Sequence, residues 1–341
     1  MLRLIEDPEA KAAAQAELEA RIRERLADQG VRNIGFPSGN TDEVVYAEGA
    51  GGLWAAFTPL KAAAVPRQWN AFGLYDPSLH AQMITVEINV PTADNSARVA
   101  GFYARDPQTD RVYLMHDGSV GGGRPGVGRD AFLSWTRATT VDVVRSDGVV
   151  RSGVVVGAVE VDDFVSHLRR FVMRVRRFKA AVAAGALDTV EAAEAIAEWE
   201  AFNSESSGRR RGRRRADLDY VSYHGDVVDA LQRERSSRLR ADERILNNRL
   251  IDLYVRRGRD MTEIYEVKTG VDRQAIYTGM GQLLTHSTGA PSSVKRTLVL
   301  PEGDLPRDIR EALLALGIEL RRFTIRGGDA PEVVLSASGQ T

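Results

Sequence analysis

The sequence predicts an α/β protein, α+β overall, made of two domains joined by a helical connector. Its 341 residues leave room for two domains. Residues 83–156 contain strand-like runs separated by short turns, as in β-hairpins. In residues 220–325, segments with helical periodicity follow segments with strand periodicity in turn. A low-complexity basic run at residues 209–215 separates the two regions and marks a boundary.

Composition narrows the class of protein. Hydrophobic residues make up 43% of the chain and charged residues 27%, as in ordinary globular proteins. The absence of cysteine excludes disulfides, thiolate zinc sites and cysteine nucleophiles, and it suits a reducing compartment. No apolar run approaches the ~20 residues that span a bilayer. We therefore expect a cytoplasmic protein without a membrane partner.

Residues 1–160 are expected to form a mixed domain rich in antiparallel β-structure. A charged helix over residues 8–29 comes first. A stretch rich in Gly and Pro, residues 31–67, follows, and the sequence leaves its arrangement open. Alternating and β-branched runs then predict strands joined by short polar turns. These strands cover residues 83–90, 99–105, 111–116, 139–145 and 149–156.

Two helices are expected to form the connector over residues 161–203. The first, residues 162–184, has an apolar stripe and basic outer faces, and the second, residues 189–202, is acidic and rich in Ala. A linker over residues 204–216 follows, with six arginines that either contact nucleic-acid phosphates or form a solvated segment. They are Arg209, Arg210, Arg211, Arg213, Arg214 and Arg215. The second domain is then expected over residues 217–341.

A β-hairpin in this second domain brings acidic residues together. Residues 249–255 and 263–269 have strand character on either side of a polar turn. With the turn centred near Arg259, the antiparallel register places Asp252 across from Glu266, their β-carbons about 5 Å apart. Period-2 alternation puts Lys268 on the same face as Glu266.

Facing carboxylates indicate a divalent cation, because like charges opposed on a sheet are otherwise destabilising. Mg²⁺ takes oxygen ligands and is typically held by one or two carboxylates, and Mn²⁺ is able to substitute. The chain has 41 arginines and only five lysines, one of which is Lys268. A lysine kept in so arginine-rich a sequence indicates a position where a compact ammonium is needed and a guanidinium does not fit. Lys268 can orient or deprotonate an attacking water and stabilise charge on a phosphate. These residues predict phosphodiester hydrolysis.

The helix expected over residues 272–286 has one apolar face and a second face that is small and polar. This small, polar surface is expected to permit close backbone approach to the substrate, with the Gln282 amide available to a phosphate or a metal-bound water. The second face consists of Ala275, Thr278, Gly279, Gln282 and His286. A strand, a helix and a strand follow, over residues 296–300, 305–316 and 318–325. The expected order is αββαβαβ.

Three short segments carry a resemblance to a known family. They are Ile251-Asp252, Glu266-Val267-Lys268 and Gly281-Gln282. Together they resemble the PD-(D/E)XK nuclease superfamily, in the glutamine-bearing form of its restriction- and resolvase-like branches, over residues 220–325. The resemblance implies a three-layer α/β/α restriction-endonuclease-like core and magnesium-dependent cleavage of DNA or, less often, RNA.

The resemblance also implies a role for each matching residue. Asp252 and Glu266 would be the metal ligands, Lys268 the catalytic lysine and Gln282 an accessory residue. Two positions depart from the family pattern. Ile251 stands where the family has proline. Residues 224–231 resemble the preceding helix but lack its usual acid, for which His224 or Asp226 can substitute.

The leading expectation is a DNA endonuclease of a restriction or phage-defence type that cuts DNA, modified DNA included, as a homodimer. The N-terminal domain would select the target, with Trp69 and Phe72 as candidates for base recognition and core packing as their alternative role. A dimerisation or regulatory role for that domain stays open. Two other functions also stay open, a non-catalytic nucleic-acid-binding protein that keeps the nuclease fold and a ligand-regulated RNA or DNA nuclease effector.

Overall fold

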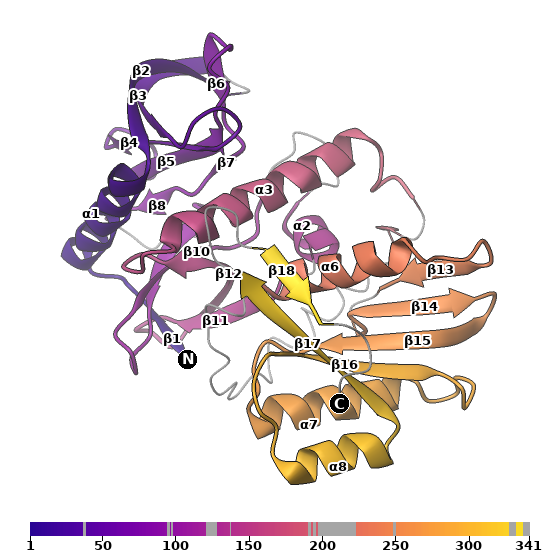
Figure 1. Ribbon diagram of the computed structural model, residues 1–341. Helices are drawn as coiled ribbons and strands as arrows, with labels where there is room; N and C mark the ends of the chain where they lie inside the picture. The colour runs from indigo at the N-terminus through magenta and orange to yellow at the C-terminus, as the bar shows by residue number, and fades with distance from the viewer. Residues whose placement is uncertain are drawn as a thin grey trace. The chain divides into compact units, whose positions relative to one another are not determined.

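The computed structural model describes residues 1–36, 39–93, 96, 98–120, 128–136, 138–189, 192–193, 196, 223–247, 250–326 and 332–336. Helices and three sheets make up this part of the chain, so the expected mixed class is confirmed (Figure 1). The chain divides into two compact units, Met1–Thr136 with Thr140–Ala193, and Glu194–Thr341 with Arg137–Thr139.

The first unit contains a closed five-stranded barrel of order β1-β11-β12-β10-β9. Its strands are β1 (Leu2–Leu4), β9 (Gly101–Arg105), β10 (Val112–His116), β11 (Thr140–Val144) and β12 (Val150–Ala158). The hairpins β9–β10 and β11–β12 match the sequence prediction. Strand β1 closes the barrel by pairing in parallel with β11 and antiparallel with β9.

A seven-stranded sheet also belongs to the first unit, with the order β6-β2-β3-β4-β5-β7 and β8 paired to β5. Its strands are β2 (Ala27–Phe36), β3 (Gly39–Ala47), β4 (Leu53–Leu60), β5 (Arg67–Leu74), β6 (Ala81–Met83), β7 (Val86–Glu87) and β8 (Val90–Pro91). The region that the sequence left open is thus a meander of long strands. The single strand expected over residues 83–90 is instead three short ones.

Three helices complete this unit: α1 (Pro8–Arg25), α2 (Arg129–Thr136) and α3 (Phe164–Ala183). Helix α1 begins where the Asp7 side chain accepts a hydrogen bond of 2.8 Å from the Ala10 N–H. It ends before the expected Gln29, because Ala27 already pairs with Ala47 in β2–β3. Helix α3 packs on β12, α1 and α2, so it belongs to this unit rather than to a separate connector. The expected helix over residues 189–202 lies mostly outside the described residues.

The second unit is built on a six-stranded sheet of order β13-β14-β15-β16-β17-β18. Pairs β15–β16 and β16–β17 are parallel and the others antiparallel. Its elements are α6 (His224–Ser236), β13 (Glu243–Leu246), β14 (Leu253–Arg257), β15 (Asp260–Val267), α7 (Arg273–His286), β16 (Lys295–Pro301), α8 (Arg307–Ala315), β17 (Ile318–Arg326) and β18 (Glu332–Leu335). The expected αββαβαβ order is present, with β13 and β18 as additional edge strands.

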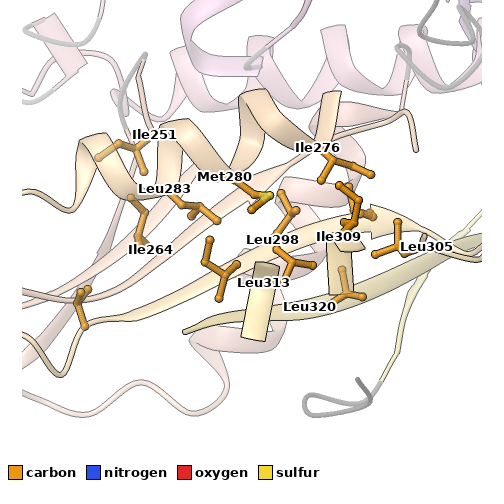
Figure 2. Packing of buried hydrophobic residues seen from close by; sticks show 13 residues of the cluster. Ile251, Ile264, Ile276, Met280, Leu283, Leu298, Leu305, Ile309, Leu313 and Leu320 are labelled. Atoms are coloured by element: carbon orange, nitrogen blue, oxygen red, sulfur yellow. The ribbon is translucent and has the colours of Figure 1, made fainter. Parts of the chain in front are cut away.

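Alternate residues of this sheet enter different cores. Leu298 of β16 faces a cluster formed with α7 and α8, shown in Figure 2. Its neighbour Val299 faces a second cluster formed with α6. Helix α6 therefore covers one face of the sheet, and α7 and α8 cover the other. None of the helices in the described ranges combines the length and apolarity that a membrane span requires.

Candidate active site

The site begins with the register of the β14–β15 hairpin. Leu253 pairs with Tyr265 and Arg257 with Asp260, which leaves a two-residue turn of Gly258 and Arg259. Gly258 has φ 59°, a conformation that favours glycine at the first position of such a turn. Extended by one residue beyond Leu253, where β14 begins, the same register would place Asp252 across from Glu266, the pairing expected from the sequence.

Asp252 is held through one of its two carboxylate oxygens. Its Oδ2 accepts a hydrogen bond of 2.8 Å from the Val267 N–H. The same oxygen lies 3.3 Å from Nε2 of His224, the first residue of α6. Both contacts fall on Oδ2, so they fix the orientation of the carboxylate while Oδ1 makes no hydrogen bond within the described ranges. A held carboxylate with one uncommitted oxygen is suited to binding a cation.

Lys268 joins the hairpin to α7. Its Nζ donates hydrogen bonds of 2.6 Å to Glu266 Oε1 and 2.6 Å to Gln282 Oε1. Its backbone N–H bonds to the Val299 carbonyl at 2.9 Å, so the strand direction continues past the end of β15. The side chains of Glu266 and Lys268 are only 5% and 15% exposed. The structure therefore brings Glu266, Lys268 and Gln282 together.

The two carboxylates have different proton affinities. Burial, together with the charge of Asp252, raises the pKa of Glu266 to about 7 despite the opposing effect of Lys268. Burial also disfavours the charged form of Asp252. There, however, His224, the Val267 N–H and Lys268 outweigh it and lower the pKa of Asp252 below its ordinary value. At neutral pH Asp252 is charged and Glu266 is close to the midpoint of its titration.

The small residue on α7 packs against the sheet rather than facing a substrate. Gly279 is buried, and a β-carbon built on it would lie 2.6 Å from Leu298 Cδ1 and 3.3 Å from Lys268 Cγ. Gly279 is therefore a packing residue rather than part of the exposed polar face of α7. Its missing side chain instead lets α7 lie close enough to β16 for Gln282 to reach Lys268.

Two accessory candidates lie on α6, and they differ in position. His224 touches Asp252 directly, and its Nδ1 is buried without a hydrogen-bond partner among the described residues. Asp226 is half-buried in the first turn of the same helix. His224 is thus joined to the acid pair through Asp252.

Sequence reasoning did not find the ion pairs that fasten α6 to the hairpin. Arg235 Nε lies 2.9 Å from Glu263 Oε2, and Arg235 Nη2 lies 2.7 Å from Glu243 Oε2. The Arg235 guanidinium lowers the pKa of Glu243 to about 2. These ion pairs tie the helix that carries His224 to the strands that carry the acids. Their sequence separations are irregular, so no local pattern could indicate them.

The donor set can be tested against Mg²⁺. In the ranges that the structure describes, no three His, Asp or Glu side chains form a metal-binding group. Asp252 and Glu266 nevertheless offer two hard oxygen donors side by side, and Mg²⁺ often takes no more than two carboxylates from a protein. Burial and the charge of Asp252 raise the pKa of Glu266, so a cation bound beside the two acids would stabilise its charged form. The two residues fit such a cation.

The remaining predicted site residues are not part of this cluster. Trp69 and Phe72 are 5% and 0% exposed and lie in the packing of the seven-stranded sheet. They are core residues, which is the alternative role that the sequence left open for them. The arginines of residues 209–215 lie outside the described residues.

Comparisons of the chain with models of protein families, with curated proteins and with solved structures found no match to any of them.

Proposed function

We propose that this chain is a Mg²⁺-dependent endonuclease of the PD-(D/E)XK type that hydrolyses phosphodiester bonds in DNA. The observation that carries the proposal is the contact of one lysine with an acid and an amide, Lys268 with Glu266 and Gln282, beside a second acid, Asp252. A buried lysine beside paired carboxylates is suited to cleaving a negatively charged ester.

Each side chain has a role that follows from its contacts. Asp252 and Glu266 would hold the metal ion, which when bound would stabilise charge on the scissile phosphate and lower the pKa of a water. The ammonium of Lys268 has three N–H donors, and Glu266 and Gln282 accept two of them. The third is available to orient the attacking water or to donate to a phosphate oxygen. His224 fixes Asp252, and Gln282 fixes Lys268.

The surrounding architecture supports the same proposal. The hairpin with its two acids, a helix, two parallel strands and helices on both faces of the sheet agree with the restriction-endonuclease-like core that the motif resemblance implies. We further propose that the first unit selects the target, that the enzyme acts as a dimer to cut both strands, and that it serves restriction or phage defence.

A digestion experiment tests the proposed reaction. The full chain is incubated with supercoiled plasmid DNA or structured RNA in Mg²⁺, Mn²⁺, Ca²⁺ or excess chelator. Cleavage of DNA is expected with Mg²⁺ or Mn²⁺. With Ca²⁺ it is expected to be inefficient, because the longer bonds of Ca²⁺ misplace the attacking water. Full activity after exhaustive chelation would rule the proposal out.

Substitutions identify the residues involved. Asp252→Asn, Glu266→Gln and Lys268→Ala should each lower the cleavage rate at least about a hundredfold without loss of the fold. Lys295→Ala and Glu319→Gln are matched controls, because both residues are exposed in the same unit and removed from the acid pair by sequence and strand. Near-normal activity of Lys268→Ala would remove this mechanism from consideration.

A further inference from the structure

Strands β13 and β14 of the second unit carry exposed side chains, Arg244 and Arg256. Helix α7 packs on β15 and β16, and α8 packs on β17. Figure 1 shows β13 and β14 at the part of the sheet away from α7 and α8. We name the α7-side surface of β13 and β14 the open face.

Alternation assigns four side chains to the open face. Tyr254 packs against the α7-side core, whereas Leu253 and Ile245 belong to the α6-side core. Leu246 pairs with Tyr254 and therefore shares its side. Arg244 and Arg256 are two residues further along the same strands, so they too lie on the α7 side.

Two positive charges face each other there. Arg244 pairs directly with Arg256 across β13–β14, and both residues are exposed. Like charges in such a position are destabilising, because their β-carbons are only about 5 Å apart. On the opposite face the adjacent pair is complementary, with Arg257 Nη2 at 3.2 Å from Glu243 Oε1.

No counter-charge is present on the open face. Within the described ranges, neither Arg244 nor Arg256 forms an ion pair, and Arg256 Nη2 donates only to the Arg259 carbonyl at 2.8 Å. The hairpin thus presents two cations that lack a protein anion. A phosphate backbone has the charge that would compensate them.

The open face and the acid pair lie on the same side of the sheet. Lys268 contacts Gln282 of α7, which places the site on the α7 side. Arg256 pairs with Met261, five residues along β15 from Glu266. Five strand residues span about 17 Å. Along one strand of duplex DNA, that distance corresponds to about five nucleotides.

We propose that the open face, made by Arg244, Leu246, Tyr254 and Arg256, binds the phosphate backbone of duplex DNA about five nucleotides from the bond that is cut. This inference rests on the proposed nuclease function and adds the path of the substrate. Tyr254 and Leu246 form the floor of the path, and the two guanidiniums contact phosphates at its outer end. The contacts carry no base information, so they act on any sequence.

Salt dependence of binding tests the path. Binding of the full chain to a labelled 30-base-pair duplex is measured by fluorescence anisotropy in chelator, between about 50 and 200 mM salt. Each lost phosphate contact reduces the slope of log K against log salt by about 0.9, so the double variant Arg244→Gln/Arg256→Gln should lose about 1.8. Its affinity at 0.1 M salt should fall roughly 10- to 100-fold, equally for unrelated sequences.

Two further double variants separate position from net charge. Arg244→Lys/Arg256→Lys should keep most of the slope, because a phosphate accepts a point charge. Arg307→Gln/Arg310→Gln on α8 removes the same charge from another exposed surface and should leave the slope unchanged. Thermal unfolding checks that all variants fold.

The outcomes distinguish the two proposals. An unchanged slope in Arg244→Gln/Arg256→Gln, or an equal loss in the α8 control, would overturn the open face while leaving the nuclease proposal intact. A wild-type chain that neither binds nor cuts duplex DNA would overturn both.

Discussion

At the scale of single residues, the contact between His224 and Asp252 joins a helix to the acid pair. The 3.3 Å contact falls on the same oxygen that the Val267 N–H holds. His224→Ala should therefore loosen the Asp252 carboxylate and raise the Mg²⁺ concentration for half-maximal cleavage about 10- to 100-fold. A magnesium titration of the cleavage rate measures this shift.

Controls for His224 use its hydrogen-bonding ability. His224→Asn retains an N–H donor and should recover part of the metal affinity. His286→Ala removes a half-buried histidine near the end of α7 and should leave the affinity unchanged. If His224→Ala keeps the wild-type magnesium requirement, the histidine does not position the acid.

The raised pKa of Glu266 has a consequence for stability. Its ordinary pKa is 4.5 and burial beside Asp252 raises it to about 7, so the folded chain holds this proton more tightly than the unfolded chain. The resulting stability is fully present below about pH 4.5 and is lost as the pH rises through 7, a loss of the order of 3 kcal/mol. The free energy of unfolding of Glu266→Gln, relative to wild type, should grow by about that amount between pH 4.5 and 8.

Denaturant unfolding in chelator at several pH values measures this difference. Other groups, such as His116 with its pKa lowered to about 4 by burial, affect both proteins equally and cancel in the comparison. Parallel pH profiles for the two proteins would show that folding does not raise the pKa of Glu266.

The sequence was informative about some site residues and silent about others. Asp252, Glu266 and Lys268 could be placed because strand alternation and one short turn fix their geometry locally. The buried state of Glu266 could not be anticipated, because it depends on α6 and α7 closing over the sheet from both sides. Trp69 and Phe72 were assigned a recognition role as candidates, but aromatic residues in a strand are equally suited to a core, and the structure buries both.

At the scale of elements, the close approach of α7 to β16 depends on Gly279. A β-carbon there would meet the buried Leu298 side chain at 2.6 Å and crowd the Lys268 stem. Gly279→Ala should destabilise the fold by about 1–2 kcal/mol, because overpacking outweighs the gain in helix propensity. The cleavage rate should fall as well, since Lys268 is displaced from Gln282.

Gly281 offers a matched control on the same helix. It is exposed, and a β-carbon on it would meet nothing within 4 Å. Gly281→Ala should therefore stabilise the helix by up to about 1 kcal/mol and leave the cleavage rate unchanged. Equal unfolding midpoints for the two variants would show that α7 tolerates a side chain at the Gly279 contact.

Elements defined by local patterns were predicted better than elements defined by distant pairing. Helix α7 and strands β16 and β17 matched closely, because each has a clear period and the Asp272 side chain caps α7. Edge strands β13 and β18 are short and half-exposed, so they carry little hydrophobic signal. The barrel was not foreseen, because β1 finds its partners more than a hundred residues away.

At the scale of the whole molecule, the chain has two compact units, each with its own buried core. The acid pair and Lys268 can act on any phosphodiester, so target choice is expected to come from the first unit. Residues 194–341 expressed alone should therefore cut without the preference of the full chain. Matched DNA substrates that differ in sequence and in cytosine or adenine modification measure that preference.

The fragment experiment has a clear opposing outcome. If residues 194–341 fold, as judged by circular dichroism, and keep the preference of the full chain, the first unit does not select the target. A dimerisation or regulatory role would then replace it, and the molar mass of the full chain and the fragment in solution would distinguish these two roles.

Closure of the barrel by β1 also constrains how the protein is made. Leu2 and Arg3 pair with Val143 and Val144, about 140 residues later. At about 5–20 residues per second, a ribosome needs roughly 7–28 s to synthesise the intervening chain. Until then the apolar side chains of Leu2 and Leu4, almost fully buried in the finished barrel, have no complete partner surface. We therefore expect the nascent first unit to expose these side chains during synthesis, and codon changes that slow translation before residue 144 would lengthen that exposure.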